Sequence, residues 1–396
     1  MSPRPTLEVA DIFRQYGPAY RQAHPLPLHQ HRLMQAIEAC RTPVLGGVVE
    51  WCGHCHYTHI RYRSCRNRHC PKCQGLARAK WLQQRTAELL PTEYFHVVFT
   101  IPEPLAAIAF HNKDVVYDIL FRTTAGTLLT IARDPRHLGA EIGFFAVLHT
   151  WGQNLHLHPH LHCVVPGGGL SPDGEWIACR PGFFLPIRVL SRLFRRLFLE
   201  ALENAYAHAE LRFFGELEPL REPQAFARYV ASVREIDWVV YAKPPFGGPQ
   251  HVLEYLGRYT HRVAISNARL LQLQQGQVSF RWKDYRHPQR PKVMTVSAEE
   301  FLRRFMLHAL PRGFPRIRHY GLLANCHRAA KLDCCRQYLA LRCADLLPQA
   351  AHARAFYALR TGRDPRRCPK CAVGAMIQIQ IWLPCHGPVP LRVDTS

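Results

Sequence analysis

Acidic residues are scarce in this sequence. Its 29 Asp and Glu stand against 51 Lys and Arg, which gives a formal net charge of +22 before any of the 24 histidines is protonated. So strong an excess of positive charge favours a polyanionic partner. No uncharged apolar run approaches the roughly 18 residues of a membrane helix, and Glu8 lies where a signal peptide would be apolar. We therefore expect a soluble intracellular protein with no membrane partner.

The sequence also lacks the G-x-x-x-x-G-K-[ST] pattern, which excludes a P-loop ATP-driven motor. Its 396 residues allow about two to four domains, and 47% hydrophobic residues with 11% aromatics exclude wholesale disorder. The 15 cysteines cluster partly as C-x2-C pairs in a long chain without an export signal. That usage favours metal ligation over disulfides.

The order of apolar patterns predicts an α+β fold. From Tyr94 onward, β-type runs such as YFHVVFTIP, GFFAVLHTWGQ and QVSFRWKDYR alternate irregularly with helical stretches such as VLSRLFRRLFLEALENAYAHAE. The absence of a βαβ rhythm favours a central antiparallel sheet flanked by helices. Ser297, followed by Glu299 and Glu300, predicts a capped helix up to Pro311. We expect three consecutive parts: a small N-terminal module at 1–90, the sheet domain at 91–310, and a basic helical C-terminal region at 311–396.

Two cysteine pairs in the N-terminal module predict a structural zinc site. Fourteen residues separate Cys52-x2-Cys55 from Cys70-x2-Cys73, a spacing typical of two knuckles that share one tetrahedral zinc. Further donors in the same stretch leave ligand swapping or a second ion open: Cys65, His54, His56 and His69. The alternative is four reduced, buried thiols that hold no metal.

Basic residues surround these knuckles. Residues 41–85 hold nine Lys and Arg against Glu50 alone, a local charge of 9 − 1 = +8. Such density releases counterions from a nucleic-acid backbone, and interleaved aromatic rings can stack on bases. A solvated surface that only aids solubility is the alternative. The residues that we expect to bind DNA in this module are Arg61, Arg63, Arg66, Arg68 and Lys72.

Four histidines alternate in the segment WGQNLHLHPHLHCVVPGGG, at positions 156, 158, 160 and 162. Alternate side chains of a strand share a face, so His160 and His162 can bind one divalent ion together. Pro159 predicts that regular strand pairing begins only after it. The pattern by itself reveals neither the metal nor the reaction.

A tyrosine pair lies about ninety residues further on, in PQHVLEYLGRYTHR. Tyr255 and Tyr259 are four residues apart, so in a helix their side chains lie on one face. Such pairs are most often core residues, but Arg258 and Arg262 beside them suit phosphate contacts. His251 and Glu254 are candidates for a further metal ligand.

Metal, paired phenols and a basic body together predict a specific chemistry. The ion polarises a phosphodiester oxygen, and a tyrosine hydroxyl attacks phosphorus and displaces the 3′ oxygen. The products are a covalent 5′-phosphotyrosine and a free 3′-OH, which can be rejoined without ATP.

The chain resembles the two-tyrosine HUH transposases of the insertion-sequence-91 family along nearly its whole length. The resemblance rests on SCRNRHCPKCQ (64–74), HPHLH (158–162) followed by GGG, YLGRYTHR (255–262), WKDYR (282–286) and EFLRRFMLHALPRGFPRIRHYGLLAN (300–325). It implies an HUH endonuclease domain with an RNA-recognition-like antiparallel sheet. By this likeness His160 and His162 bind Mg²⁺ or Mn²⁺, and Tyr255 and Tyr259 are the nucleophiles.

The resemblance also implies a substrate and partners: single-stranded DNA at the ends of a mobile element, moved by rolling-circle-like transposition with a host helicase and polymerase. The protein would then be cytoplasmic and nucleoid-associated in a bacterium. The oligomeric state is not predicted. One departure is Cys368-x2-Cys371, which either forms a second zinc site with Cys385 and His386 or stays an unmetallated hairpin.

Two rival functions fit parts of the sequence. A zinc-dependent DNA-binding regulator would use the histidines only for packing or for a structural ion. A metal-dependent nuclease would activate water at His160 and His162 and leave 5′-phosphate products, with no DNA joined to protein.

Overall fold

The computed structural model describes residues 7–243, 251–252, 263–283, 291–339, 358, 364 and 366–384. These residues form two compact units, and each unit joins distant parts of the chain. Unit 1 is built from stretches within 1–84, 261–309 and 348–396, and unit 2 from stretches within 85–260 and 310–347. The division into 1–90, 91–310 and 311–396 stays a prediction, and the two units group the chain differently because the C-terminal stretch is shared between them.

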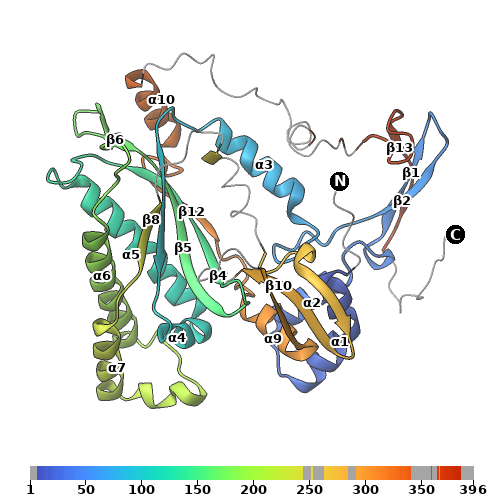
Figure 1. Ribbon diagram of the computed structural model, residues 1–396, viewed down its shortest axis with the longest axis horizontal. Coiled ribbons are helices and arrows are strands. Elements are labelled where there is room, and N and C mark those ends of the chain that lie inside the picture. The colour runs from blue at the N-terminus through green and yellow to red at the C-terminus, as the bar shows by residue number, and fades with distance from the viewer. Residues whose placement is uncertain are drawn as a thin grey trace. The chain divides into compact units, whose positions relative to one another are not determined.

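A five-stranded sheet forms the centre of unit 2 (Figure 1). All of its neighbouring strands are antiparallel, in the order β12-β4-β5-β3-β8. This arrangement confirms the predicted α+β class with an antiparallel sheet. The strands are β3 (Tyr94–Thr100), β4 (Gly143–Trp151), β5 (Leu157–Pro166), β8 (Val240–Lys243) and β12 (Ile317–Gly321).

Alternating side chains give this sheet two different faces. Phe95, Val97 and Phe99 of β3 are buried in the main hydrophobic core, as are the alternate residues of β4 and β5. Helices from the same unit complete that core, so this face is closed to solvent. They are α4 (Leu105–His111), α5 (Lys113–Arg133), α6 (Ile187–Ala207) and α7 (Pro223–Glu235), with the 3-10 turn η2 (Gly215–Arg221).

Within the described residues, α5 is the one helix that is long and apolar enough to cross a membrane. Tyr117, Leu120, Phe121 and Leu128 on it are buried in the core. Its apolar character is therefore that of a core helix, which packs against α6 and the sheet.

The part of unit 2 after residue 310 is less helical than predicted. Residues 317–321 pair with β4 as strand β12. Only α10 (Arg328–Tyr338) is a regular helix among the described residues from 311 to 339. It packs over a small second core with Leu90 and Leu170, close to the hairpin of β6 (Gly168–Leu170) and β7 (Trp176–Ala178).

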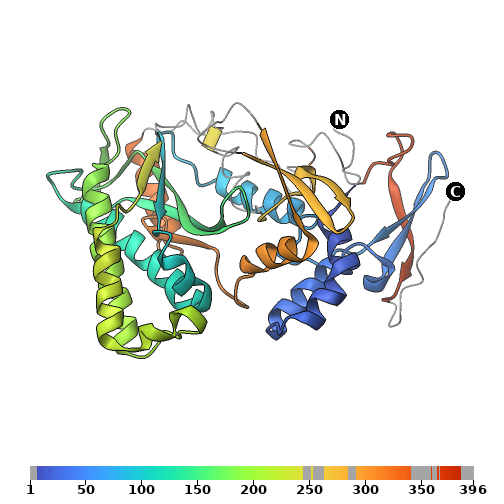
Figure 2. The same cartoon turned by 60° about the horizontal axis from the view of Figure 1, so that its bottom comes forward.

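Unit 1 contains two three-stranded antiparallel sheets, ordered β13-β1-β2 and β11-β10-β9. Figure 2 shows the second sheet (yellow to orange) above the orange helix α9, with the blue helices α1 and α2 to the right of α9. The first sheet contains β1 (Gly47–Cys52), β2 (Thr58–Tyr62) and β13 (Met376–Trp382). The second contains β9 (Leu270–Gln274), β10 (Gln277–Lys283) and β11 (Pro291–Ser297). The helices of unit 1 are α1 (Val9–Ala23), α2 (Leu28–Glu38), α3 (Gln74–Thr86, whose last two residues belong to unit 2) and α9 (Ala298–Leu307), with 3-10 turns η1 (Pro43–Leu45) and η3 (Asn267–Arg269).

The start of α9 confirms the capping prediction. The hydroxyl of Ser297 accepts a hydrogen bond from the Glu300 amide at 3.1 Å. Glu300 also pairs with Arg303 and Arg304 on the same helix. On the buried side, the Phe305 ring meets Phe13 of α1 edge to face, with centroids 5.1 Å apart. The helix is thus fixed at its first turn and along its apolar face.

Candidate metal centres

Three histidines converge on the sheet face of unit 2 that faces away from the main core. Ligand nitrogens of His149, His160 and His162 all lie within 4.8 Å of one another. His160 and His162 alternate along β5, and His149 lies directly opposite His160 on β4. Strand register and alternation therefore place the three rings together. His149 and His162 are buried, whereas His160 keeps partial exposure.

The hydrogen bonds of His160 prepare it to bind a metal. Its Nδ1 lies 2.6 Å from the carbonyl oxygen of His158, which can only accept, so Nδ1 carries the proton. Its Nε2 therefore presents a lone pair. This nitrogen lies 3.1 Å from Nε2 of His162, so two potential ligand atoms face the same point.

His96 on β3 supports the cluster from behind. Its Nε2 lies 2.8 Å from Nδ1 of His162, and the two rings stack with centroids 5.0 Å apart. His96 is 2% exposed, and burial, with smaller effects of Lys243 and His160, lowers its pKa to about 3. A neutral His96 can accept the Nδ1 proton of His162, which makes Nε2 the nitrogen of His162 that could ligate a metal.

The structure brings together only part of the predicted ligand set. It brings His160 and His162 together, as predicted, and adds His149, which the sequence interpretation missed. His251, the candidate third ligand, is exposed and does not belong to the cluster of the described residues. Strand β5 begins at Leu157 rather than after Pro159. Pro159 falls within the register shift between the pairs His149–His160 and Trp151–Leu157, where its missing N–H costs no ladder bond.

The predicted nucleophiles lie outside the described residues. Tyr255 and Tyr259, with Glu254, Arg258 and Arg262, fall in the stretch 253–262. His251 and Val252, immediately before this stretch, are helical.

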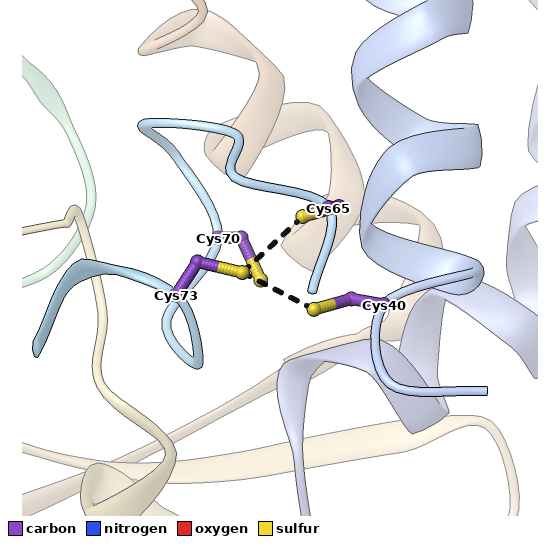
Figure 3. Close-up of side chains that lie close together, drawn as sticks. All are labelled: Cys40, Cys65, Cys70 and Cys73. Carbon is purple, nitrogen blue, oxygen red and sulfur yellow. Dashed lines mark hydrogen bonds between the residues drawn. The ribbon is translucent and has the colours of Figure 1, made fainter. Parts of the chain in front are cut away.

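A first cysteine cluster lies in unit 1 and is shown in Figure 3. The sulfur of Cys73 lies 3.2 Å from that of Cys40 and 3.5 Å from that of Cys65, and Cys70 completes the group. Cys40 follows α2, whereas the other three come from the turn before α3. Four thiols converging from two segments match the tetrahedral ligand set of a structural zinc.

A second cluster contains Cys52 and Cys55, together with Cys368 and Cys371. The prediction that Cys52, Cys55, Cys70 and Cys73 share one zinc is therefore wrong. The reason is that β1 and β2 form a hairpin whose turn carries the first pair away from the second, so each pair finds other partners. Cys385 and His386, considered as partners of Cys368 and Cys371, lie outside the described residues.

The basic residues of this module differ in availability. Arg63 and Arg66 are exposed, and Arg61 is exposed but donates to Glu50 at 2.5 Å. Lys72 is 11% exposed and forms an ion pair with Glu8, and burial lowers the pKa of Arg68. Among the predicted DNA-binding residues that the structure describes, Arg63 and Arg66 are thus the best placed to meet a phosphate backbone.

Comparison with known proteins shows which families match the stretches that carry these clusters. A family described as "Transposase zinc-binding domain" matches residues 12–101, which include Cys40, Cys65, Cys70 and Cys73. A second family, described as "Putative transposase", matches residues 143–331, which include all three histidines. No solved structure matches the chain.

Two relatives extend the match over most of the chain. "Putative transposase y4qJ" of Sinorhizobium fredii is 62% identical over 395 residues, 98% of each protein. The chain belongs to the insertion-sequence-91 family of transposases. The "Transposase for insertion sequence element IS801" of Pseudomonas savastanoi pv. phaseolicola is 29% identical over 349 residues, 84% of this chain and 79% of that relative. An insertion-sequence-91 transposase with an N-terminal zinc-binding domain is what the sequence resemblance implied.

Membership in the family supports zinc as the ion of the first cysteine cluster. The four ligands come from within the matched zinc-binding domain, and soft thiolates are the donors that zinc prefers in structural sites. The histidine cluster differs in kind, because it offers three nitrogen donors and no thiolate.

Proposed function

We propose that this transposase nicks and rejoins single-stranded DNA at the ends of a mobile element through a 5′-phosphotyrosine intermediate. The observation that carries the proposal is the cluster of His149, His160 and His162 on one sheet face. Three side chains leave coordination positions free, as catalytic metal sites require. Such a site suits a phosphodiester oxygen.

The bound ion would supply Lewis acidity toward a non-bridging phosphate oxygen. The protein's own nucleophile would be Tyr255 or Tyr259. The phenol proton passes to solvent, the phenol oxygen forms a bond to phosphorus, and the bond from phosphorus to the 3′ oxygen breaks. The departing 3′ oxygen takes up a proton and becomes a free 3′-OH. Attack by a 3′-OH on the phosphotyrosine reverses the step and joins strands without ATP.

Of the two ions considered, the donor set favours Mn²⁺. Mg²⁺ prefers oxygen ligands in a strict octahedron, whereas imidazole suits transition metals. Three imidazoles and no carboxylate make up the cluster among the described residues. His149 takes the ligand role for which His251 was the earlier candidate.

The remaining roles follow from charge. With 51 Lys and Arg against 29 Asp and Glu, the chain can hold DNA by its phosphates. Arg61, Arg63 and Arg66 in the zinc module, and Arg258 and Arg262 beside the tyrosines, would supply such contacts. Action on bacterial DNA places the protein in the cytoplasm at the nucleoid, with a host helicase supplying the single strand.

The test is a search for the covalent intermediate. The protein is incubated with Mn²⁺ and single-stranded oligonucleotides from both element ends, then denatured and run on a gel. We expect a DNA-linked protein band that the double variant Tyr255→Phe/Tyr259→Phe loses. An adduct that persists in the double variant contradicts the assignment of the nucleophiles.

A metal-dependent nuclease is the second candidate, because three histidines also hold a water-activating ion in other metalloenzymes, such as carbonic anhydrase. That enzyme would release 5′-phosphate ends, form no adduct, and keep its cleavage in the double Phe variant. A non-catalytic regulator would bind the oligonucleotides and cleave none of them. One gel thus separates the three functions.

A further inference from the structure

Two cysteine turns far apart in the sequence share the same backbone conformation. In the first, the amide of His56 donates to the carbonyl of Cys52 at 2.9 Å, and His56 has a φ of 57°. In the second, the amide of Ala372 donates to the carbonyl of Cys368 at 3.0 Å, and Ala372 has a φ of 58°. In both, the left-handed residue directly follows the second cysteine of a C-x2-C pair. Two non-glycine residues in this uncommon conformation at matching positions indicate a common constraint.

Backbone amides point at the sulfur atoms of the second turn. The amide of Lys370 donates to the sulfur of Cys368, and that of Gly374 to the sulfur of Cys371, each at 3.4 Å. Amide donors stabilise a thiolate over a thiol, and the thiolate is the form that binds metal. This turn is therefore built to hold anionic sulfur.

The four sulfur atoms of the two turns are spaced as metal ligands. The sulfur of Cys52 lies 3.8 Å from that of Cys371, and the sulfur of Cys55 lies 3.6 Å from that of Cys368. A disulfide requires about 2.05 Å. A tetrahedron with zinc–sulfur bonds of about 2.3 Å has sulfur–sulfur edges of about 3.8 Å. The observed spacing matches the second geometry.

The backbone around the sulfur atoms leaves no room for a side chain. A Cβ at Gly374 would lie 2.5 Å from the sulfur of Cys52 and 2.7 Å from Cβ of His54. Glycine at 374 is what allows the second turn to approach the first so closely.

Strand pairing continues directly from the cysteines. Cys52, the last residue of β1, pairs with Met376 at the start of β13, and the ladder runs on to Gly47 and Trp382. The cluster thus sits at the end of the ladder that joins the two ends of the described chain, where a crosslink holds the strands in register.

We propose that Cys52, Cys55, Cys368 and Cys371 form a second structural zinc site, separate from that of Cys40, Cys65, Cys70 and Cys73. This zinc fastens residues 366–382 to the N-terminal hairpin of β1 and β2. The transposase therefore holds two structural zinc ions, and the zinc module includes a C-terminal segment beyond the matched stretch 12–101. The proposal does not depend on the reaction at the histidine cluster.

Metal content of the full-length protein tests the proposal. The protein is purified with zinc, passed over a weak chelating resin to strip the histidine site, and its zinc is measured by mass spectrometry. We expect two zinc ions per chain, and one in the variant Cys368→Ser/Cys371→Ser. The control is Cys326→Ser/Cys334→Ser, in which two cysteines outside both clusters change and two zinc ions remain. One zinc ion in the unaltered chain overturns the proposal.

A second measurement uses the unaltered protein, so its result does not depend on whether the variant folds. N-ethylmaleimide labelling, followed by peptide mass spectrometry, reads each cysteine separately. We expect Cys368 and Cys371 to react at least tenfold more slowly than exposed Cys326, and to lose that protection after prolonged treatment with a strong chelator. Labelling as fast as Cys326, or labelling only after a reductant is added, contradicts zinc ligation and indicates free thiols or a disulfide. Gly374→Ala keeps every thiol and should lose the protection of Cys52, Cys55, Cys368 and Cys371, while Cys40, Cys65, Cys70 and Cys73 stay protected.

Discussion

The cysteine clusters of unit 1 and the histidine cluster of unit 2 use the chain in opposite ways. Each cysteine cluster closes on four thiols from separate segments, so it ties the chain to itself. The histidine cluster offers three nitrogens from adjacent strands that the sheet already holds in register. As we propose their roles, the first kind would create structure through its metal, and the second would receive a metal on existing structure. The difference teaches that ligand type and ligand number separate a structural from a catalytic role.

The largest effect is expected in the first cysteine cluster, where loss of a ligand should destabilise the fold. Cys70→Ser removes a thiolate from a closed site, and structural zinc contributes on the order of 10 kcal/mol of apparent folding free energy in small modules. We expect loss of one zinc ion and rapid proteolysis between residues 40 and 74. Limited digestion with peptide mapping measures this. Retained zinc with an unchanged digest would show that the cluster is not a metal site.

A smaller effect, on activity alone, is expected from the histidine cluster. His149→Ala removes one of three ligands from a preformed sheet, so cleavage should fall at least about 100-fold, equivalent to about 2.7 kcal/mol. The thermal midpoint and DNA affinity should change little. The matched control is His251→Ala, which we expect to retain cleavage. The opposite ranking of the two variants would restore His251 as the third ligand.

His160→Ala tests whether DNA cleavage and single-strand DNA affinity depend on different parts of the protein. We expect it to abolish cleavage and to leave single-strand affinity largely intact, because in our proposal the zinc module and the basic surface supply that affinity independently of the histidine cluster. Gel-shift titration beside the cleavage assay measures both quantities. Parallel loss of binding and cleavage in a folded variant would contradict that division of labour.

His96 provides a more graded test. His96→Leu leaves Nδ1 of His162 without its acceptor, so we expect a loss of about 10–100-fold in Mn²⁺ affinity. Saturating Mn²⁺ should restore most of the cleavage rate, whereas it should not rescue His149→Ala to the same degree. Metal titration of the cleavage rate separates positioning from ligation. His156→Ala, outside the cluster, serves as the control.

The smallest expected effect concerns the choice of ion. Three imidazoles favour Mn²⁺ over Mg²⁺, so half-maximal cleavage should need several-fold less Mn²⁺. Cleavage rates measured against the concentration of each ion provide the comparison. Equal requirements would indicate that oxygen ligands dominate the site.

The sequence predicts the strands and helices of unit 2 well because alternation and helical periodicity are local. The same locality explains why His149 was missed. Its own segment, GFFAVLHTW, reads as a plain buried strand, and only the register of β4 against β5 brings it opposite His160. A histidine on a strand next to an H-x-H strand is the signal that could have been used.

The cysteine pairing failed for a related reason. Cys52-x2-Cys55 and Cys70-x2-Cys73 are close in sequence, and spacing alone favours joining them. Their actual partners include the isolated Cys40 and Cys65, and a pair more than 300 residues later. Nothing local distinguishes these alternatives, because the choice depends on where the hairpin of β1 and β2 directs its turn. The tyrosine pair stays a prediction.

The pairing of β13 with β1 also has a consequence for synthesis. At about 5–20 residues per second, the ribosome makes residue 376 roughly 15–65 s after residue 52. During that interval one edge of β1 offers unpaired amides and carbonyls, a template for wrong partners. A nascent or prematurely terminated chain would therefore carry an aggregation-prone strand edge and an incompletely folded N-terminal module. We expect chaperones and proteases to recognise such chains.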